Sequence, residues 1–253
     1  MAKIDYYKLL TTKKDDYLFN LFDIENFNKE TSRLRFFFNH IRRSDKSIKG
    51  NIFEFGTYQG RSLLATALLL KKIKSNKIIY AFDSFTGLSK YTKYDDVEYL
   101  KYDDAVYLKH LIAKNIKEIN LEKKINRRNI STSNEFKNRK KNILLEKIRI
   151  LKLDNIKIIE GLFQKTVPKF FANYDKKISA VNMDCDLYDS YKTVLPVIYK
   201  KLEKGGYIHI DEYFSIKYPG CRIAVDEFCK ENKVRIKKNK SFDWEFDRYF
   251  IKK

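Results

Sequence analysis

Two apolar segments of this sequence have the length of a β-strand and end abruptly in carboxylic acids. They span residues 179–183 and 207–210, and the acids that follow them are Asp184, Asp186, Asp211 and Glu212. In an open parallel α/β sheet, ligands bind in the crevice at the carboxyl ends of the strands, so these acids would face it together. Carboxylate oxygens are good ligands for hard divalent cations. We therefore expect a parallel sheet with a cation site at that edge.

Residues 51–83 predict a βαβ unit, in which a turn containing Gly56 and Gly60 joins a strand to a helix. The strands are expected at residues 51–55 and 78–82, and the helix at residues 63–70. Glycine permits a ligand to approach the backbone closely, and helix N-terminal amides face such a ligand. The turn is not the dinucleotide fingerprint, because its two glycines are separated by three residues, and this disfavours a dehydrogenase. Asp83 follows the second strand, where such folds bind ribose hydroxyls.

The rest of the sequence fits a single domain spanning residues 1–253. We expect a strand at 156–160, a helix near 168–174 and an antiparallel pair of strands in the alternating tail. Residues 1–48 carry apolar clusters among charged neighbours, which is typical of a helical arm that caps the domain or forms a homodimer. Residues 89–155 are a long polar insertion, expected to be a lid or a substrate-binding segment.

Charge and composition narrow the classes of function. The chain has 53 Lys and Arg against 33 Asp and Glu, a net charge of +20, but the lysines run along its whole length. No RRM signature, zinc finger or basic zipper accompanies them, so nucleic acid is disfavoured as a partner. We expect the charge to reflect a compositional habit of Lys-rich coding, with attraction of an anionic substrate as the alternative. No apolar stretch approaches the roughly 20 residues of a membrane span, and no signal peptide is recognisable. We expect a cytoplasmic protein with free cysteines.

Five motifs, in order, resemble the macrocin O-methyltransferases, which are S-adenosylmethionine- and metal-dependent enzymes that act on sugar hydroxyls. The motifs are FEFGTYQGRS (53–62), FDSFTGL (82–88), IEGLF with TVP (159–168), DCDLYDS (184–190), and GGY, DEY and PGCRIAVDEF (205–228). The resemblance covers roughly residues 50–90 and 150–230. It implies a Rossmann-like class I methyltransferase fold, with a seven-stranded, mostly parallel sheet, an antiparallel C-terminal hairpin, a helical N-terminal arm and a long helical insertion.

The resemblance also implies a role for particular residues. Those implied to bind S-adenosylmethionine are Glu54, Gly56, Thr57, Tyr58, Gly60, Ser62, Asp83, Ser84, Gly161 and Asp184, with Asp83 and Ser84 at its ribose. The implied metal ligands are Asp184, Asp211 and Glu212, where the family usually has two adjacent aspartates in place of Asp211 and Glu212. Oxygen-only ligands favour Mg²⁺, with Mn²⁺ or Ca²⁺ as substitutes.

Methyl transfer from a sulfonium to an alcohol requires alignment of the reacting atoms and removal of a weakly acidic proton. Asp186, on the same side of the strand as Asp184, is the predicted general base. His209 shares a strand face with Asp211 and is the rival base, or else a packed strand residue. We expect the substrate to be a nucleotide-linked sugar for bacterial surface (capsular) polysaccharide. The alternatives are a catechol-type O-methyltransferase and, less favoured, an RNA-binding or RNA-methylating protein.

Overall fold

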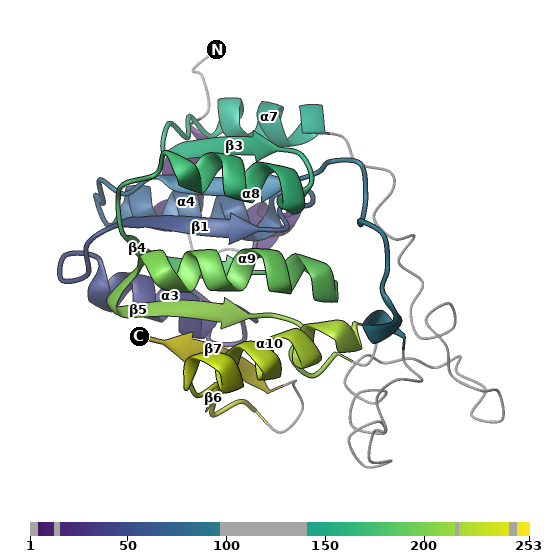
Figure 1. The fold of residues 1–253 in the computed structure, drawn as a ribbon. Coiled ribbons are helices and arrows are strands. Elements are labelled where there is room, and N and C mark those ends of the chain that lie inside the picture. Colours follow the sequence, from purple (N-terminus) through teal and green to yellow (C-terminus); the bar gives the residue numbers. More distant parts are fainter. Residues whose placement is uncertain (1–4, 13–15, 97–140, 216–217, 243–246) are drawn as a thin grey trace, which may run out of the picture.

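The computed structural model describes residues 5–12, 16–96, 141–215, 218–242 and 247–253, which form a seven-stranded sheet between two layers of helices (Figure 1). The strand order is β3-β2-β1-β4-β5-β7-β6. The strands are β1 (Asn51–Phe55), β2 (Ile79–Asp83), β3 (Ile156–Glu160), β4 (Ile178–Met183), β5 (Leu202–Ile210), β6 (Lys237–Asn239) and β7 (Arg248–Lys252). Strands β1 to β5 are parallel, whereas β7 is antiparallel to both β5 and β6. The predicted mostly parallel sheet and its C-terminal hairpin are confirmed.

The strand sequences follow from their positions in the sheet. Every residue of the central strand β4 is buried, whereas none of the edge strand β3 is fully buried. A parallel strand covered on both faces requires mostly apolar side chains throughout, which is the pattern that made β1 and β4 recognisable. The expected strands at 51–55 and 156–160 are confirmed to the residue. The strand expected at 207–210 begins earlier, at Leu202, because the segment before it also pairs with β4.

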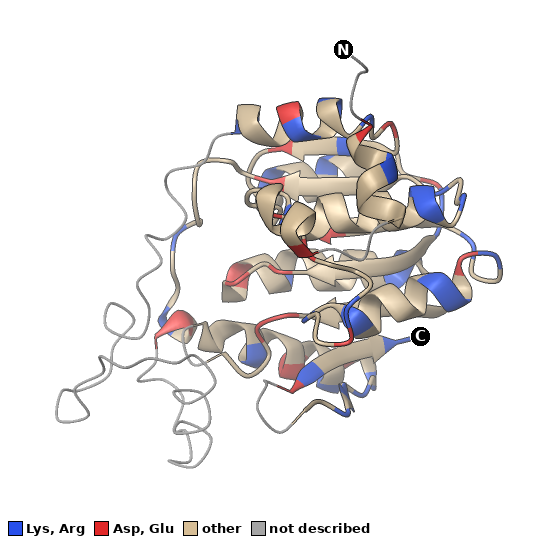
Figure 2. Ribbon diagram, turned by 180° about the vertical axis from the view of Figure 1, so that it is seen from behind, with Lys and Arg blue, Asp and Glu red and all other residues tan. Residues whose placement is uncertain are grey.

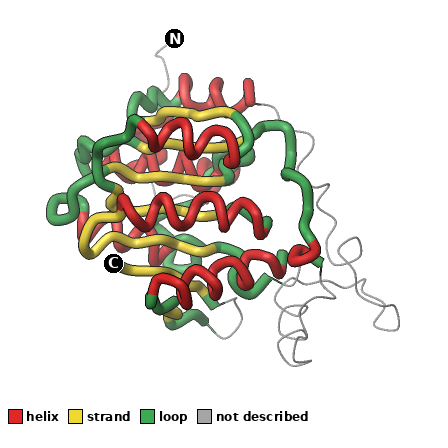
Figure 3. The backbone as a smooth tube through the Cα atoms, in the orientation of Figure 1, coloured by secondary structure: helices red, strands yellow, loops and turns green. Residues whose placement is uncertain are grey.

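Helices cover both faces of the sheet (Figures 1 and 3). One face packs against α1 (Tyr6–Thr12), α2 (Asp16–Leu21), α3 (Arg35–Ser44), α4 (Arg61–Lys72) and α7 (Lys141–Ile150). The other packs against α8 (Phe163–Ala172), α9 (Tyr188–Lys201) and α10 (Pro219–Asn232). The helix expected from Pro168 in fact begins at Phe163. Proline favours a helix start because it lacks an amide hydrogen, but here the amphipathic face of α8 outweighs the lost backbone bond.

The N-terminal arm packs onto its own domain. Phe19, Phe27 and Phe38 are almost completely buried in the same core as α4. The apolar clusters that suggested either a cap or a dimer contact are therefore largely used within the chain. Tyr17 and Leu21 remain exposed, at 68% and 62%. A homodimer through this arm stays a prediction.

Both described ends of the insertion are attached near the carboxyl edge of the sheet. At one end, Asp95 of the short 3₁₀ helix η1 (Lys93–Asp95) is fully buried and accepts a hydrogen bond from the amide of Tyr188, at the start of α9. At the other end, Leu144 of α7 lies so close to Gly60 that a β-carbon added there would be 2.3 Å from its Cδ1. The predicted lid falls mainly on residues 97–140, which lie outside the described part of the chain.

The positive charge of the described residues is not confined to one element. Lysines and arginines occur on several separate helices, strands and loops (Figure 2). Acidic residues are found among them and at the strand ends that bear the candidate site. None of the described helices is long and apolar enough to cross a membrane.

Candidate active site

One row of backbone hydrogen bonds joins the carboxyl ends of five neighbouring strands. The amide of Gly161 donates to Asp83, that of Gly56 to Phe82, that of Asp184 to Phe55 and that of Asp211 to Met183, at distances from 2.9 to 3.0 Å. These bonds continue the parallel ladder one residue beyond β3, β1, β4 and β5. The residues that sequence motifs placed in the site therefore lie along one rigid edge, although they are far apart in the chain.

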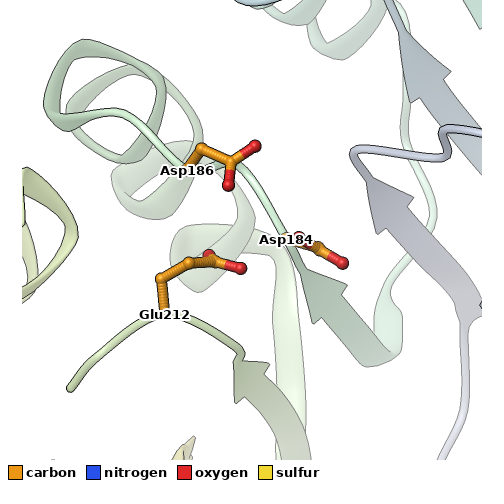
Figure 4. A group of neighbouring side chains, drawn as sticks. All are labelled: Asp184, Asp186 and Glu212. Carbon is orange, nitrogen blue, oxygen red and sulfur yellow. The ribbon is translucent and has the colours of Figure 1, made fainter. Parts of the chain in front are cut away.

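Three of the four predicted acids gather between the ends of β4 and β5. Oxygens of Asp184, Asp186 and Glu212 lie within 4.8 Å of one another, with Glu212 extending toward Asp184 (Figure 4). Asp186 has a left-handed backbone, with φ of 59°, two residues before the start of α9. The hydroxyl of Tyr191 donates to Glu212 over 2.7 Å. The predicted general base is thus part of the same cluster as two of the predicted metal ligands.

Asp211, the fourth acid, is the first residue after β5 and lies outside that cluster. Its Oδ2 lies 3.3 Å from Nη1 of Arg33, while Nη2 of Arg33 lies 3.6 Å from Asp184 Oδ2. Its Oδ1 lies 3.5 Å from Nε2 of His209. The guanidinium of the N-terminal arm therefore bridges the ends of two strands. No sequence motif marked Arg33.

Burial and mutual repulsion shift the pKa values of these acids in different directions. Burial and the nearby Asp211 raise the pKa of Asp184 to about 6. Burial, with Asp184 and Asp211, raises the pKa of Glu212 well above its usual range. Burial also acts to raise the pKa of Asp211, but Arg33, His209 and Arg248 together outweigh it and hold that pKa well below the usual range. Like charges this close need positive charge to remain ionised together.

The donor set of this edge fits a hard divalent cation. It consists of carboxylate oxygens, which suit Mg²⁺, Mn²⁺ and Ca²⁺ better than softer metals. Oδ1 of Asp211 is buried and has no hydrogen-bond partner in the described structure. The tightest trio contains Asp186, whereas the predicted ligand set contains Asp211 with Asp184 and Glu212. The predicted set therefore needs Asp211 to turn from Arg33 toward the cation.

The glycine turn after β1 is held by close backbone packing. Gly56 has φ of +87°, and a β-carbon added there would lie 1.8 Å from the carbonyl oxygen of Asp184. Gly60, with φ of +83°, immediately precedes α4. Thr57 is buried, and its hydroxyl oxygen has no hydrogen-bond partner, whereas Tyr58 is 43% exposed. The turn thus places amides, a free hydroxyl and an aromatic ring beside the acidic cluster.

Asp83 fixes this turn through backbone hydrogen bonds. Its Oδ2 accepts hydrogen bonds from the amides of Thr57 and Tyr58, both at 2.8 Å, and its Oδ1 accepts one from Phe85 at 2.7 Å. A carboxylate has about four acceptor positions, and these backbone amides use three of them, two from the glycine turn and one from the loop after β2. Ser84, the other predicted ribose contact, donates its hydroxyl to the carbonyl of Gly87 over 2.7 Å. The ribose contacts stay predictions, and the structure adds a positioning role for Asp83.

Asp83→Asn is expected to destabilise the free protein by about 2 kcal/mol, because an amide group presents one acceptor oxygen where the carboxylate presents two. The amide NH₂ would then face a backbone N–H. Urea unfolding without any ligand measures the change, and Asp154→Asn, at an exposed acid, is the matched control. Unchanged stability would mean that Asp83 does not hold the turn.

A buried polar row crosses the three central strands behind the turn. Glu54 pairs in register with Asn182, and Asn182 with His209. Each is at most 1% exposed. Glu54 accepts a hydrogen bond from Ser62 over 2.9 Å, and burial raises its pKa to about 8. This row connects the glycine turn to Asp211. The sequence could have suggested it, because each of the three apolar strands contains one polar residue near its carboxyl end.

His209, the rival base, lies behind Asp211. It is completely buried, its ring is 6.4 Å from that of Phe37, and neither ring nitrogen has a hydrogen bond. Burial lowers its pKa, which favours the neutral ring. Its position favours a role in orienting Asp211, whereas Asp186 lies in the cluster itself. The assignment of the general base stays a prediction.

A family model and a curated relative match this chain. The family model described as Macrocin-O-methyltransferase (TylF) matches residues 31–246. A demethyldecarbamoylnovobiocin O-methyltransferase of Streptomyces niveus is 35% identical over 75 residues, which are 30% of this chain and 27% of the relative. The match therefore spans about a quarter of that relative's length.

Two solved structures share the fold. The O-methyltransferase NovP aligns with a TM-score of 0.62 and 19% identity, covering 87% of this chain and 78% of NovP. The apo structure of CalS11, a TDP-rhamnose 3'-O-methyltransferase of calicheamicin biosynthesis, aligns with a TM-score of 0.56 and 20% identity, covering 98% and 91%.

Proposed function

Because this chain belongs to the macrocin O-methyltransferase family, we propose that it transfers a methyl group from S-adenosylmethionine to a hydroxyl group of a sugar, with help from a divalent cation. The prediction of an O-methyltransferase is confirmed at the level of the family. The observation that carries the proposal is the edge where the glycine turn after β1 meets the acidic ends of β4 and β5. The buried acid Glu54, beside the turn, suits a cationic cofactor, and the acids at the strand ends suit a hard cation.

Glu54 and the turn fit the methionine end of the cofactor. The hydrogen-bond donors to Glu54, Ser62 and Asn182, are neutral, and burial favours its protonated form. An ammonium group placed beside Glu54 would stabilise its ionised form. The buried hydroxyl of Thr57 and the exposed ring of Tyr58 offer further contacts. Gly56, Gly60, Gly161, Asp83 and Ser84 shape the same surface.

Asp184, Asp211 and Glu212 are proposed to hold Mg²⁺, or Mn²⁺ or Ca²⁺ in its place. A cation bound there supplies Lewis acidity and a template for sugar hydroxyls. Asp186 lies within the same cluster and is proposed to accept the hydroxyl proton. His209 is proposed to keep Asp211 in place from the buried side.

A nucleotide-linked sugar is the proposed substrate, and bacterial surface (capsular) polysaccharide its proposed destination. The similarity to CalS11, a TDP-rhamnose 3'-O-methyltransferase, supports the nucleotide-linked form. A net charge of +20 would also raise the encounter rate with a diphosphate.

The test is turnover of S-adenosylmethionine by the full chain against nucleotide sugars, free sugars and catechols, with products identified by mass spectrometry. We expect methylation of a nucleotide sugar, loss of turnover with EDTA and recovery with Mg²⁺. Failure of the folded protein to bind S-adenosylmethionine in calorimetry would refute the activity. Turnover that survives EDTA would refute only the role of the cation, and a preference for catechols would refute the sugar.

A further inference from the structure

Arg33 is held in a fixed position beside the acidic cluster. Glu25, a buried acid of the same arm, accepts hydrogen bonds from the Arg33 amide at 3.2 Å and from the Ser32 hydroxyl at 2.7 Å. It also accepts one from Nε of Arg61, the first residue of α4, at 3.1 Å. The arm is therefore attached to the helix that follows the glycine turn, and its backbone directs Arg33 toward the strand ends.

The guanidinium of Arg33 contacts the same oxygens that a cation would use. Its two terminal nitrogens lie 3.3 Å from Oδ2 of Asp211 and 3.6 Å from Oδ2 of Asp184. The acid side chains are only 14% and 25% exposed, and that of Arg33 is 37% exposed. Because these side chains are partly exposed, solvent screens the two ion pairs to some extent, but less than it screens an ion pair on the open surface.

A divalent cation on those two acids excludes this position of Arg33. Mg²⁺ binds carboxylate oxygens at about 2.0–2.1 Å, and its two charges would repel a guanidinium a few ångströms away. Asp211 would also have to turn from Arg33 to join Asp184 and Glu212. Glu25 lies near enough to influence the charge of Arg33 and gives the displaced guanidinium a second anionic neighbour.

We propose that Arg33 is a built-in competitor of the divalent cation: it neutralises Asp184 and Asp211, and cation binding displaces it and its contact with the N-terminal arm. The inference rests on the proposed function, because it takes the cation from there. Beyond that function, it assigns Arg33 the role of lowering the affinity for the cation. It also links the contact between the N-terminal arm and the strand ends to whether a cation is bound.

Calorimetric titration of Mn²⁺ into the full chain tests this proposal. We expect Arg33→Gln to bind Mn²⁺ about tenfold more tightly than the wild type, the effect of removing two partly exposed competing ion pairs, to Asp184 and Asp211. Arg33→Lys keeps the charge but cannot bridge both acids, so a smaller gain in affinity is expected. Arg43→Gln, at an exposed arginine of α3, removes the same charge and should bind Mn²⁺ as the wild type does.

Thermal unfolding gives a second readout. Without Mn²⁺, Arg33→Gln should unfold at a lower temperature than the wild type. Adding Mn²⁺ should raise the Tm of Arg33→Gln by more than it raises the Tm of the wild type. Equal or weaker binding of Mn²⁺ by Arg33→Gln, or no binding by either protein, would overturn the competition. If Arg33→Gln does not fold, Arg33→Lys decides by the same criterion. Turnover that is lost with EDTA, alongside unchanged Mn²⁺ affinity in the variants, would retain the proposed function and reject only this inference.

Discussion

Asp184→Asn is expected to lower methyl transfer by at least about 10³-fold, because it removes a carboxylate from the proposed cation site. Asparagine keeps the size of the side chain and one oxygen, but it loses the charge that a cation needs. Mn²⁺ affinity, measured by calorimetry, should fall together with turnover. Asp189→Asn changes an exposed acid in the first turn of α9 and should leave both quantities unchanged.

The same substitution is expected to preserve the fold and to stabilise it at neutral pH. Burial and Asp211 raise the pKa of Asp184 to about 6 from a usual value of 3.8. Between these pH values the folded protein binds more protons at this group than the unfolded chain does, so wild-type stability falls as pH rises through the interval. The asparagine side chain does not titrate, so the variant should lack this decrease.

Thermal unfolding in EDTA from pH 4 to pH 7.5 measures the difference. The Tm of the variant relative to the wild type should rise with pH and level off above about pH 6. An inactive variant with a strongly reduced Tm at every pH would mean that Asp184 is needed for folding, and its loss of activity would then carry no information about the cation. Full activity in a folded variant would exclude Asp184 as a ligand.

The sequence predicted the edge of the sheet well because local patterns determine it. Parallel strands place their carboxyl ends together, so Asp184 and Glu212 could be assigned to one site from the apolar segments before them. The turn before α4 could also be predicted from Gly56 and Gly60, since few residues other than glycine adopt a left-handed backbone readily. Family motifs then gave these positions a predicted chemistry, and the family match confirms the resemblance to the family.

The contacts that complete the site could not be read in the same way. Arg33 and Asp211 are separated by 178 residues, and nothing around Arg33 distinguishes it from the other cations of a lysine-rich chain. Asp83 was expected to face a ribose, but its position at the end of β2 says nothing about which backbone amides donate hydrogen bonds to it. These contacts depend on how the loops and the N-terminal arm pack. Such packing leaves no periodic pattern of apolar residues in the sequence from which it could be predicted.

Gly56→Ala is expected to destabilise the protein by at least about 3 kcal/mol, because the left-handed backbone alone costs about 1–2 kcal/mol and the new methyl group meets backbone. Its β-carbon would lie 1.8 Å from the carbonyl oxygen of Asp184 and 2.9 Å from the carbonyl carbon. Neither atom can move without separating β1 from β4, whose ends are joined by the bond from the Asp184 amide to Phe55. In a domain of this size, the Tm should fall by roughly 6–12 °C. Cofactor binding should be lost as well.

Gly60→Ala is the comparison that separates backbone conformation from steric contact. Its φ of +83° is nearly the same as that of Gly56, but the added β-carbon would meet the end of a flexible side chain, Cδ1 of Leu144, at 2.3 Å. We expect a loss of about 1–2 kcal/mol, because Leu144 can change rotamer. Combining Gly60→Ala with Leu144→Ala should make the two effects less than additive, whereas Gly56→Ala and Leu144→Ala should add.

Equal destabilisation by Gly56→Ala and Gly60→Ala in urea unfolding would mean that backbone conformation alone sets the cost. The close approach of the glycine turn to Asp184 would then not be what holds the cofactor turn against the acidic edge.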